Sequence, residues 1–166
     1  ATSLRVLACL ALTVCACARA GVTTRAPAWT VRVDADLSPA PPPGMTDPVP
    51  TELRIYQLHS LGSFESASYE LLHDDDKATL GESLVTKYPD RVFLYPRRPW
   101  QTELEIGPET RFLVVVAFLH RPVGRSWSYV AALPQALAAG STVTPQQLAA
   151  RPNGFTVRIG PDRVSG

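Results

Sequence analysis

Apolar and polar side chains alternate strictly over residues 29–36, WTVRVDAD. Because successive side chains of a strand point to opposite faces of the sheet, a period of two predicts a strand with one buried and one solvent-facing side. Residues 29–36 are therefore the first predicted strand.

Six further segments have the short apolar or alternating patterns of strands: 52–58, 92–95, 102–106, 112–119, 126–133 and 154–159. Residues 112–119, FLVVVAFL, form a continuous apolar run, which is typical of a central strand covered on both faces. In residues 102–106, Leu104 and Ile106 alternate with charged side chains and are predicted to face inward.

Only residues 63–86 carry apolar side chains at helical spacing, and Gly81 is a predicted break within them. Residues 131–140 and 144–150 are ambiguous, and either can be a short helix. One helical region among seven strands predicts an all-β fold. The expected architecture is an antiparallel β-sandwich with a short helical insertion between the second and third strands.

A proline-rich segment, 37–51, separates the first two predicted strands. Proline lacks a backbone donor and restricts the residue before it, so this segment is predicted to be a long, rather stiff loop. Two interpretations remain open. It is either a surface linker without a partner or a recognition loop, which would lose little entropy on binding because it is already restricted.

The N-terminal apolar run, 6–17, is too short to span a bilayer, which needs roughly 17–25 residues, but suits a signal peptide. It ends in Val-Cys-Ala-Cys, the order that a lipoprotein signal peptidase reads, so Cys17 is the predicted lipid attachment site. The expected organisation is a signal peptide over 1–16, a lipidated tether over 17–28 and a β-sandwich domain over 29–166. Modification at Cys15, an ordinary secretory signal cut near Ala20 and a cytosolic chain are the alternatives.

The charges argue against a nucleic-acid partner. The chain has 16 basic and 15 acidic residues, and removal of Arg5 with the signal peptide leaves the domain formally neutral, without a basic run longer than Arg97-Arg98. All three cysteines lie within the first 17 residues. The domain is therefore expected to lack disulfides, thiolate metal sites and a cysteine nucleophile.

No motif in the sequence predicts catalysis or a cofactor. Three consecutive carboxylates, Asp74 to Asp76, do not match the alternating ligands of a calcium loop and are predicted to form a helix cap or an ion-paired turn. The three histidines are too far apart to share a helical face, so no metal site is expected. Residues 124–128, GRSWS, lack the last glycine of a nucleophile elbow.

Taken in order, these features resemble the TssJ family, the outer-membrane lipoproteins of bacterial type VI secretion systems. The resemblance covers nearly all of the region after the signal peptide. It rests on the series formed by Cys17, the first strand, the proline-rich loop, PVPTELRIYQLHSLGSF at 48–64, SYELLHDDDKATLGESL at 68–84 and RFLVVVAF before Trp127. The loop sequence PAPPPGMTDPVP departs from the Asn and Gly-Arg-Pro elements usual in the family.

This resemblance implies a transthyretin-like β-sandwich without enzymatic activity or cofactor, lipid-anchored at the periplasmic face of the outer membrane. It implies binding to the periplasmic C-terminal region of TssM and, through it, an indirect association with TssL. In the family, the loop between the first two strands engages TssM. The expected contacts here are Leu37, Pro42, Met45 and Pro48. Ala18 after the lipid cysteine is consistent with sorting to the outer membrane.

Two rival hypotheses make structural predictions of their own. A periplasmic lipoprotein that binds a small molecule or carbohydrate requires a concave pocket lined by aromatic rings such as Tyr56, Trp100 and Trp127. A hydrolase requires a buried His–carboxylate pair beside Ser126 or Ser128. Otherwise the tryptophans are expected in the core, except that Trp100 lies in a predicted loop and is expected to be partly exposed.

Overall fold

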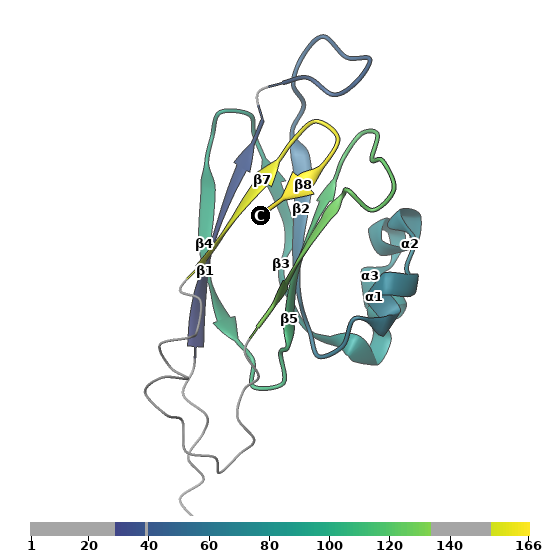
Figure 1. Ribbon diagram of the computed structural model, residues 1–166, viewed down its shortest axis with the longest axis vertical. Helices are drawn as coiled ribbons and strands as arrows, with labels where there is room; N and C mark the ends of the chain where they lie inside the picture. The colour runs from purple at the N-terminus through teal and green to yellow at the C-terminus, as the bar shows by residue number, and fades with distance from the viewer. Residues whose placement is uncertain (1–28, 39, 134–153) are drawn as a thin grey trace, which may run out of the picture.

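Two four-stranded sheets pack face to face, and three short helices lie against the outer face of one of them (Figure 1). The computed structural model describes residues 29–38, 40–133 and 154–166. The predicted signal peptide and tether, with Cys17, lie outside the described residues, as do residues 144–150 and most of 131–140. The strands are β1 (Trp29–Leu37), β2 (Thr51–Leu58), β3 (Leu84–Leu94), β4 (Trp100–Ile106), β5 (Phe112–Phe118), β6 (Ser128–Ala132), β7 (Gly154–Ile159) and β8 (Val164–Ser165).

The first sheet has the order β4-β1-β7-β8. Strand β1 is antiparallel to β4 and parallel to β7, which is the single parallel pairing among the described strands. The predicted alternation of β1 is confirmed. Val31, Val33 and Ala35 are buried between the sheets, and the intervening side chains face outward.

The second sheet has the order β3-β2-β5-β6, and all its pairings are antiparallel. Every residue of β2 except the half-buried Glu52 is buried, because the other sheet covers one face of the strand and the helices cover the other. The apolar run of β5 is buried for the same reason. The prediction of a β-sandwich with a helical insertion after the second strand is thereby confirmed.

The insertion consists of α1 (Gly62–Ser66), α2 (Tyr69–Asp74), α3 (Asp76–Leu80) and a 3₁₀ turn, η1 (Gly81–Ser83). Its buried side chains, Phe64, Leu72 and Leu80, face the second sheet. Gly81, with φ +51°, ends the last α-helix as predicted. The structure describes no helix long and apolar enough to cross a membrane.

The predicted boundary between helix and third strand is wrong. Residues 84–86 belong to β3, where Leu84 pairs with Leu58 and Thr86 with Gln57. Strand β3 therefore starts eight residues earlier than the predicted 92–95. Its register shifts between the pairs made by Leu53 and Ile55, so the three residues from Pro89 to Arg91 form an irregularity that hides the strand in the sequence.

A buried ionic cluster fixes the insertion to β2 and β3. The carboxylate Oδ2 of Asp76 lies 2.7 Å from Nζ of Lys87 and 3.1 Å from the guanidinium of Arg54, and it accepts a hydrogen bond of 2.9 Å from the Tyr56 hydroxyl. Arg54 also binds Glu52 at 2.7 Å and donates to the carbonyl of Leu72 at 2.8 Å. The acidic run was predicted to form a cap or an ion-paired turn, and it does both, because Asp75 caps α3 by accepting from the backbone of Ala78.

The cluster perturbs the titration of its members. Burial raises the pKa of the Asp76 carboxyl, but the hydrogen bonds from Lys87 and Tyr56 and the positive charges beside it outweigh burial, so its pKa lies below the ordinary value. Burial and the negative charge of Asp76 both raise the pKa of the Tyr56 hydroxyl. Asp76 is therefore charged and Tyr56 neutral near pH 7.

The loop between β5 and β6 holds the other end of the insertion. Arg125 donates hydrogen bonds to the carbonyls of Phe64, Glu65 and Ala67 at the end of α1, at 2.8, 3.0 and 3.2 Å. Its guanidinium lies over the rings of Phe64 and Trp127, 5.0 and 5.1 Å from their centres. It thus gives a charged donor to carbonyls at the end of the short helix, of which that of Phe64 also accepts from the backbone N–H of Ala67.

Candidate functional site

The proline-rich loop, 38–50, extends beyond one end of the sandwich (Figure 1). It leaves the end of β1 at Leu37 and returns to the start of β2 at Thr51, so it joins the two sheets. Most of its described side chains are exposed. A rigid sandwich therefore presents a protruding loop at its end, which is a common arrangement for binding sites.

A tight turn shapes the middle of the loop. The backbone N–H of Met45 donates to the carbonyl of Pro42 at 3.0 Å, and Gly44 has φ +83°. Proline at the second position and a positive φ at the third are the features of a type II turn. The guanidinium of Arg121 lies against Gly44, where it would be 3.4 Å from a Cβ atom, so glycine suits both the turn and its neighbour.

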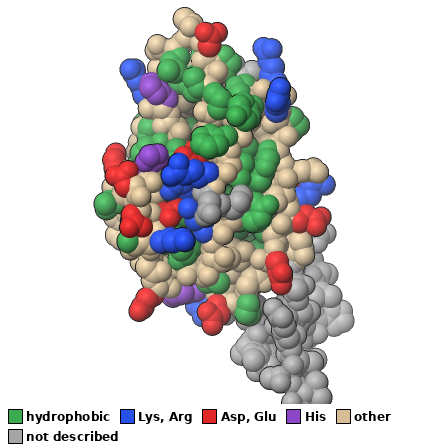
Figure 2. Space-filling view, turned by 180° about the vertical axis from the view of Figure 1, so that it is seen from behind, with side chains coloured by type: hydrophobic (Ala, Val, Ile, Leu, Met, Phe, Trp, Pro, Cys, Tyr) green, Lys and Arg blue, Asp and Glu red, His purple; other side chains and the backbone are tan. Residues whose placement is uncertain are grey.

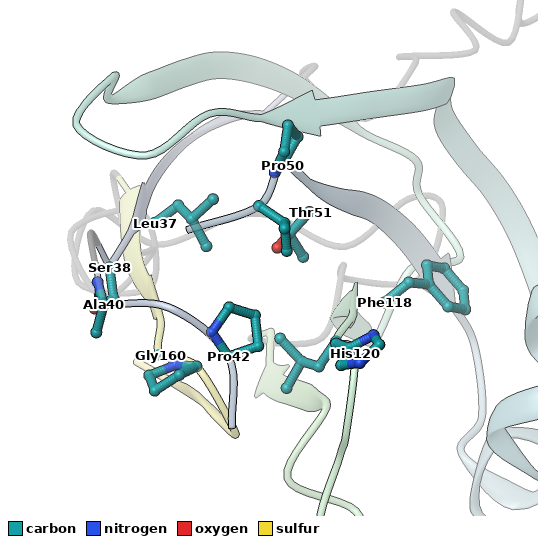
Figure 3. Close-up of a pocket in the computed structure, with 12 residues that line it drawn as sticks. Leu37, Ser38, Ala40, Pro42, Pro50, Thr51, Phe118, His120 and Gly160 are labelled. Atoms are coloured by element: carbon teal, nitrogen blue, oxygen red, sulfur yellow. Dashed lines mark hydrogen bonds between the residues drawn. The ribbon is translucent and has the colours of Figure 1, made fainter. Parts of the chain in front are cut away.

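The base of the loop encloses a hollow of about 160 Å³ (Figure 3). Its walls come from the loop and the neighbouring ends of β1 and β2, from the end of β5 and from the β7–β8 turn. The lining residues are Leu37, Ser38, Ala40, Pro42, Val49, Pro50, Thr51, Phe118, Leu119, His120, Gly160 and Pro161. Within it, Leu37, Pro42, Thr51 and Leu119 are buried, whereas Ala40, Pro50 and His120 are exposed. The hollow therefore has a buried floor and an accessible rim.

The four residues predicted to contact a partner fall into two pairs. Met45 and Pro48 are exposed in the loop, and Met45 is 41% accessible. Leu37 and Pro42 are buried and line the hollow. The first pair can touch a partner directly, whereas the second supports the loop from below.

Sequence reasoning missed the part of the site that lies outside the loop. Phe118, His120 and Pro161 line the hollow, and Arg121 contacts the loop, yet they are distant from it along the chain. Two pairings explain their position: Glu52 lies opposite Phe118, and Leu37 lies opposite Ile159. These follow from the strand order, which no local pattern in the sequence specifies.

The aromatic rings of the small-molecule hypothesis do not form a pocket. Tyr56 and Trp127 are buried; Tyr56 binds Asp76, and Trp127 packs against Phe64 and Tyr69. Trp100 is half-buried, as expected, but it begins β4 opposite Ala35, so its placement in a loop is wrong. The rings are packing residues, which counts against this hypothesis. Trp29 is also predicted to lie in the core, but its side chain is outside the described residues.

The serines of the hydrolase hypothesis bind backbone carbonyls. Ser126 donates to Asp162 at 2.6 Å, and Ser128 lies 3.4 Å from the carbonyl of Arg125. Within the described ranges, no histidine lies beside them in a hydrogen bond, and no three metal-ligating side chains gather. The protruding loop and its hollow are therefore the best candidate site.

A family comparison decides the class of protein. The family model T6SS-SciN, which describes type VI secretion lipoproteins under the names VasD, EvfM and TssJ, matches residues 28–160. The chain belongs to this family. Type VI secretion lipoproteins are not a known enzyme family, and membership makes this chain a lipoprotein component of that secretion system. No curated protein matches the sequence.

Solved structures of type VI secretion proteins share the fold. The TssJ1 lipoprotein of Pseudomonas aeruginosa is similar with a TM-score of 0.66 and 23% identity, over 84% of this chain and 95% of that chain. Serratia marcescens Lip, a membrane-bound component of the system, gives 0.66 and 20% over 82% and 94%. The structure of the TssM C-terminal domain from EAEC contains a chain that gives 0.56 and 18% over 82% and 95%. At these identities the likeness concerns the fold alone.

Proposed function

We propose that this lipoprotein anchors the type VI secretion membrane complex to the outer membrane. Loop 38–50 binds the periplasmic part of TssM, which associates in turn with TssL, and a lipid on Cys17 holds the domain at the periplasmic face of the membrane. The observation that carries the proposal is the protruding, proline-restricted loop in a domain of this family. The domain itself performs no catalysis and needs no cofactor.

The position of the loop suits a tether. Strand β1 begins at Trp29, where the domain follows the predicted tether, and its nine residues lead to the loop. At about 3.3 Å per residue, the start of the domain and the loop lie roughly 27–30 Å apart. The twelve residues of the tether, 17–28, can span up to about 40 Å when extended. An anchor at one end of the domain therefore leaves the loop at the other end free for a partner.

The chemistry of the loop suits a protein partner. Met45 and Pro48 offer exposed apolar contacts, and Met45 is unbranched and adapts to an uneven surface. The type II turn and the prolines restrict the loop before binding, which reduces the entropy lost on association. Leu37 and Pro42, packed below, hold this shape.

Co-purification with the periplasmic part of TssM tests the role of the loop. Replacement of residues 38–50 by a short Gly-Ser turn should abolish binding, and Met45→Asp should weaken it roughly tenfold or more by placing a charge in the contact. Leu71→Asp, on the exposed face of α2, is the matched control and should bind as the unmodified chain does. Unaltered binding by the loop replacement would refute the assignment of the loop.

Membrane fractionation tests the lipid anchor separately. Cys17→Ser should yield a folded domain that still binds TssM in solution but leaves the outer membrane, and secretion should stop. Cys15→Ser is the control and should remain in the membrane. Retention of the Cys17→Ser variant in the outer membrane would contradict lipidation at this residue.

A further inference from the structure

Two alternate residues of β3, and the residue that follows the strand, project outward next to the loop. Arg91, Phe93 and Tyr95 are exposed, whereas Val92 and Leu94 between them are buried in the core. The pairing of Phe93 with Glu52 places these side chains on the outer face of the second sheet, the face that also carries the helices. The strand thus has a polar and aromatic outer edge at this end of the sandwich.

The helical insertion does not cover this part of β3. Further back along the strand, Lys87 is partly buried and binds Asp76 of α3. By contrast, the side chains of Phe93 and Tyr95 are 51% and 49% accessible. Figure 2 shows apolar side chains gathered toward the loop end of this face, with Lys and Arg side chains beside them. A half-exposed aromatic pair beside cations is typical of protein interfaces, where Phe, Tyr and Arg are enriched.

The turn after β3 adds two more arginines. The backbone N–H of Arg98 donates to the carbonyl of Tyr95 at 3.1 Å, and its guanidinium lies over the Tyr95 ring, 5.9 Å from the centre. Arg97 has φ +62°, the left-handed region that glycine adopts without strain. Arg97 therefore adopts a conformation that its Cβ atom makes costly and that glycine would adopt freely, which points to a role for its side chain.

The cations of this surface have few acidic neighbours. Among the described residues, no carboxylate forms an ion pair with Arg97 or Arg98, and Arg91 is 4.0 Å from Glu52. Glu52 is already bound by Arg54 at 2.7 Å. Among the described side chains, Arg97 and Arg98 therefore present cationic groups that no carboxylate pairs.

We infer that Arg91, Phe93, Tyr95, Arg97 and Arg98, the arginine–aromatic strip, form a second docking surface, for an acidic segment of the periplasmic part of TssM. The segment would place carboxylates against the guanidinium groups and an apolar side chain between the two rings. This inference rests on the proposed function, since it names a further contact with the same partner.

The position of the strip favours a protein partner over the membrane. Thr51 pairs with Leu94, so Tyr95 lies beside Pro50 and the strip continues directly from the base of loop 38–50. Both surfaces lie at the end of the sandwich opposite the start of β1, where the domain follows the predicted tether (Figure 1). One partner can therefore contact the loop and the strip together.

The test measures binding of the full chain, in detergent, to the periplasmic part of TssM at several salt concentrations. The double variant Arg97→Glu/Arg98→Glu should bind at least tenfold more weakly, and its affinity should depend less steeply on salt, because screening acts on exposed charges. The control Lys77→Glu/Arg111→Glu makes the same change of charge at exposed positions away from the strip and should leave binding unchanged.

A second variant separates binding from folding. Arg97→Gly relieves the left-handed strain, so its melting temperature should stay the same or rise, while its affinity for TssM falls. A purely structural role for Arg97 predicts the opposite, a lower melting temperature with unchanged affinity. Pelleting with vesicles that contain anionic phospholipid asks whether the strip binds lipid instead.

The outcomes distinguish the two proposals. If the unmodified chain binds TssM and the strip variants bind equally well, the strip is refuted and the role of the loop stands. If the strip variants lose binding to vesicles but still bind TssM, the strip is likewise refuted as a docking surface for TssM. Failure of the unmodified chain to bind TssM at all overturns both proposals.

Discussion

The outer faces of the two sheets differ in their exposure to solvent. The outer face of β1 is exposed to solvent and carries Thr30, Arg32, Asp34 and Asp36. The corresponding face of β2 lies under the helices, and there Arg54 and Tyr56 are buried. A strand with one covered face alternates between apolar and polar side chains, whereas a strand covered twice needs internal partners for every polar group.

Each face contains an arginine–aspartate pair with nearly the same geometry. On the open face, Arg32 and Asp34 are 2.9 Å apart, with side chains 54% and 36% accessible. On the covered face, Arg54 and Asp76 are 3.1 Å apart and almost inaccessible. Water screens the exposed pair, so removal of one of its residues should change stability little. Removal of one residue of the buried pair leaves buried charges uncompensated and should destabilise the fold. Distance alone therefore says little about stability.

The largest effect is expected from removal of the buried carboxylate. Asp76→Ala should lower the free energy of unfolding by about 3–5 kcal/mol, because Lys87 and Tyr56 lose their shared acceptor. The matched change on the open face, Asp34→Ala, should cost less than about 1 kcal/mol. Urea unfolding of both variants measures the difference. Equal losses would contradict the contrast between the two faces.

Apolar residues of α2 provide the second comparison. Leu72 is fully buried against the sheet, whereas its neighbour Leu71 is 57% accessible. Leu72→Ala should lower the free energy of unfolding by about 2–5 kcal/mol through lost burial and the cavity left behind. Leu71→Ala should change it by less than about 0.5 kcal/mol. The same urea titrations measure both values, and a small effect of Leu72→Ala would mean that α2 does not cover the sheet tightly.

A smaller effect is expected where the insertion meets the β5–β6 loop. Arg125→Ala should cost about 1–3 kcal/mol, because the last carbonyls of α1 lose their charged donor. Arg125→Lys should recover only part of this, since an ammonium lacks the planar fork that reaches several carbonyls and stacks on rings. Thermal unfolding compares the variants. Arg121→Ala is the control, because this exposed arginine of the same loop lies against Gly44 instead of α1.

The contrast between the faces also explains which features the sequence predicts. Residues 29–36 alternate because one face of β1 is open, so the pattern alone indicates the strand and its buried side. The apolar run of β5 likewise indicates a strand covered twice. The start of β3 could not be predicted, because Leu84 and Val85 continue the helical spacing of the insertion and Pro89 interrupts the strand pattern.

The candidate site divides in the same way. A local property, the density of prolines, predicts the loop and its exposed residues Met45 and Pro48. The hollow beneath depends on strand order, which brings His120 and Pro161 to the loop from distant parts of the chain. Asp76 shows the same limit, because its partner Arg54 lies 22 residues away and nothing local marks the pair.

The smallest effect is expected in the dependence of stability on pH, because burial and ion pairing shift the pKa of Asp76 in opposite directions. Its pKa is lowered on folding, so its contribution is complete above the unfolded value of 3.8 and is lost as the pH falls through the folded value. Asp76→Asn lacks this contribution at every pH. The gap in unfolding free energy between the unmodified chain and Asp76→Asn should therefore be constant from about pH 7 to pH 5 and narrow below about pH 4. Urea unfolding across this range measures it. A gap that widens on acidification would mean that burial, not ion pairing, dominates the environment of this carboxyl, and that the covered face tolerates its charge instead of using it.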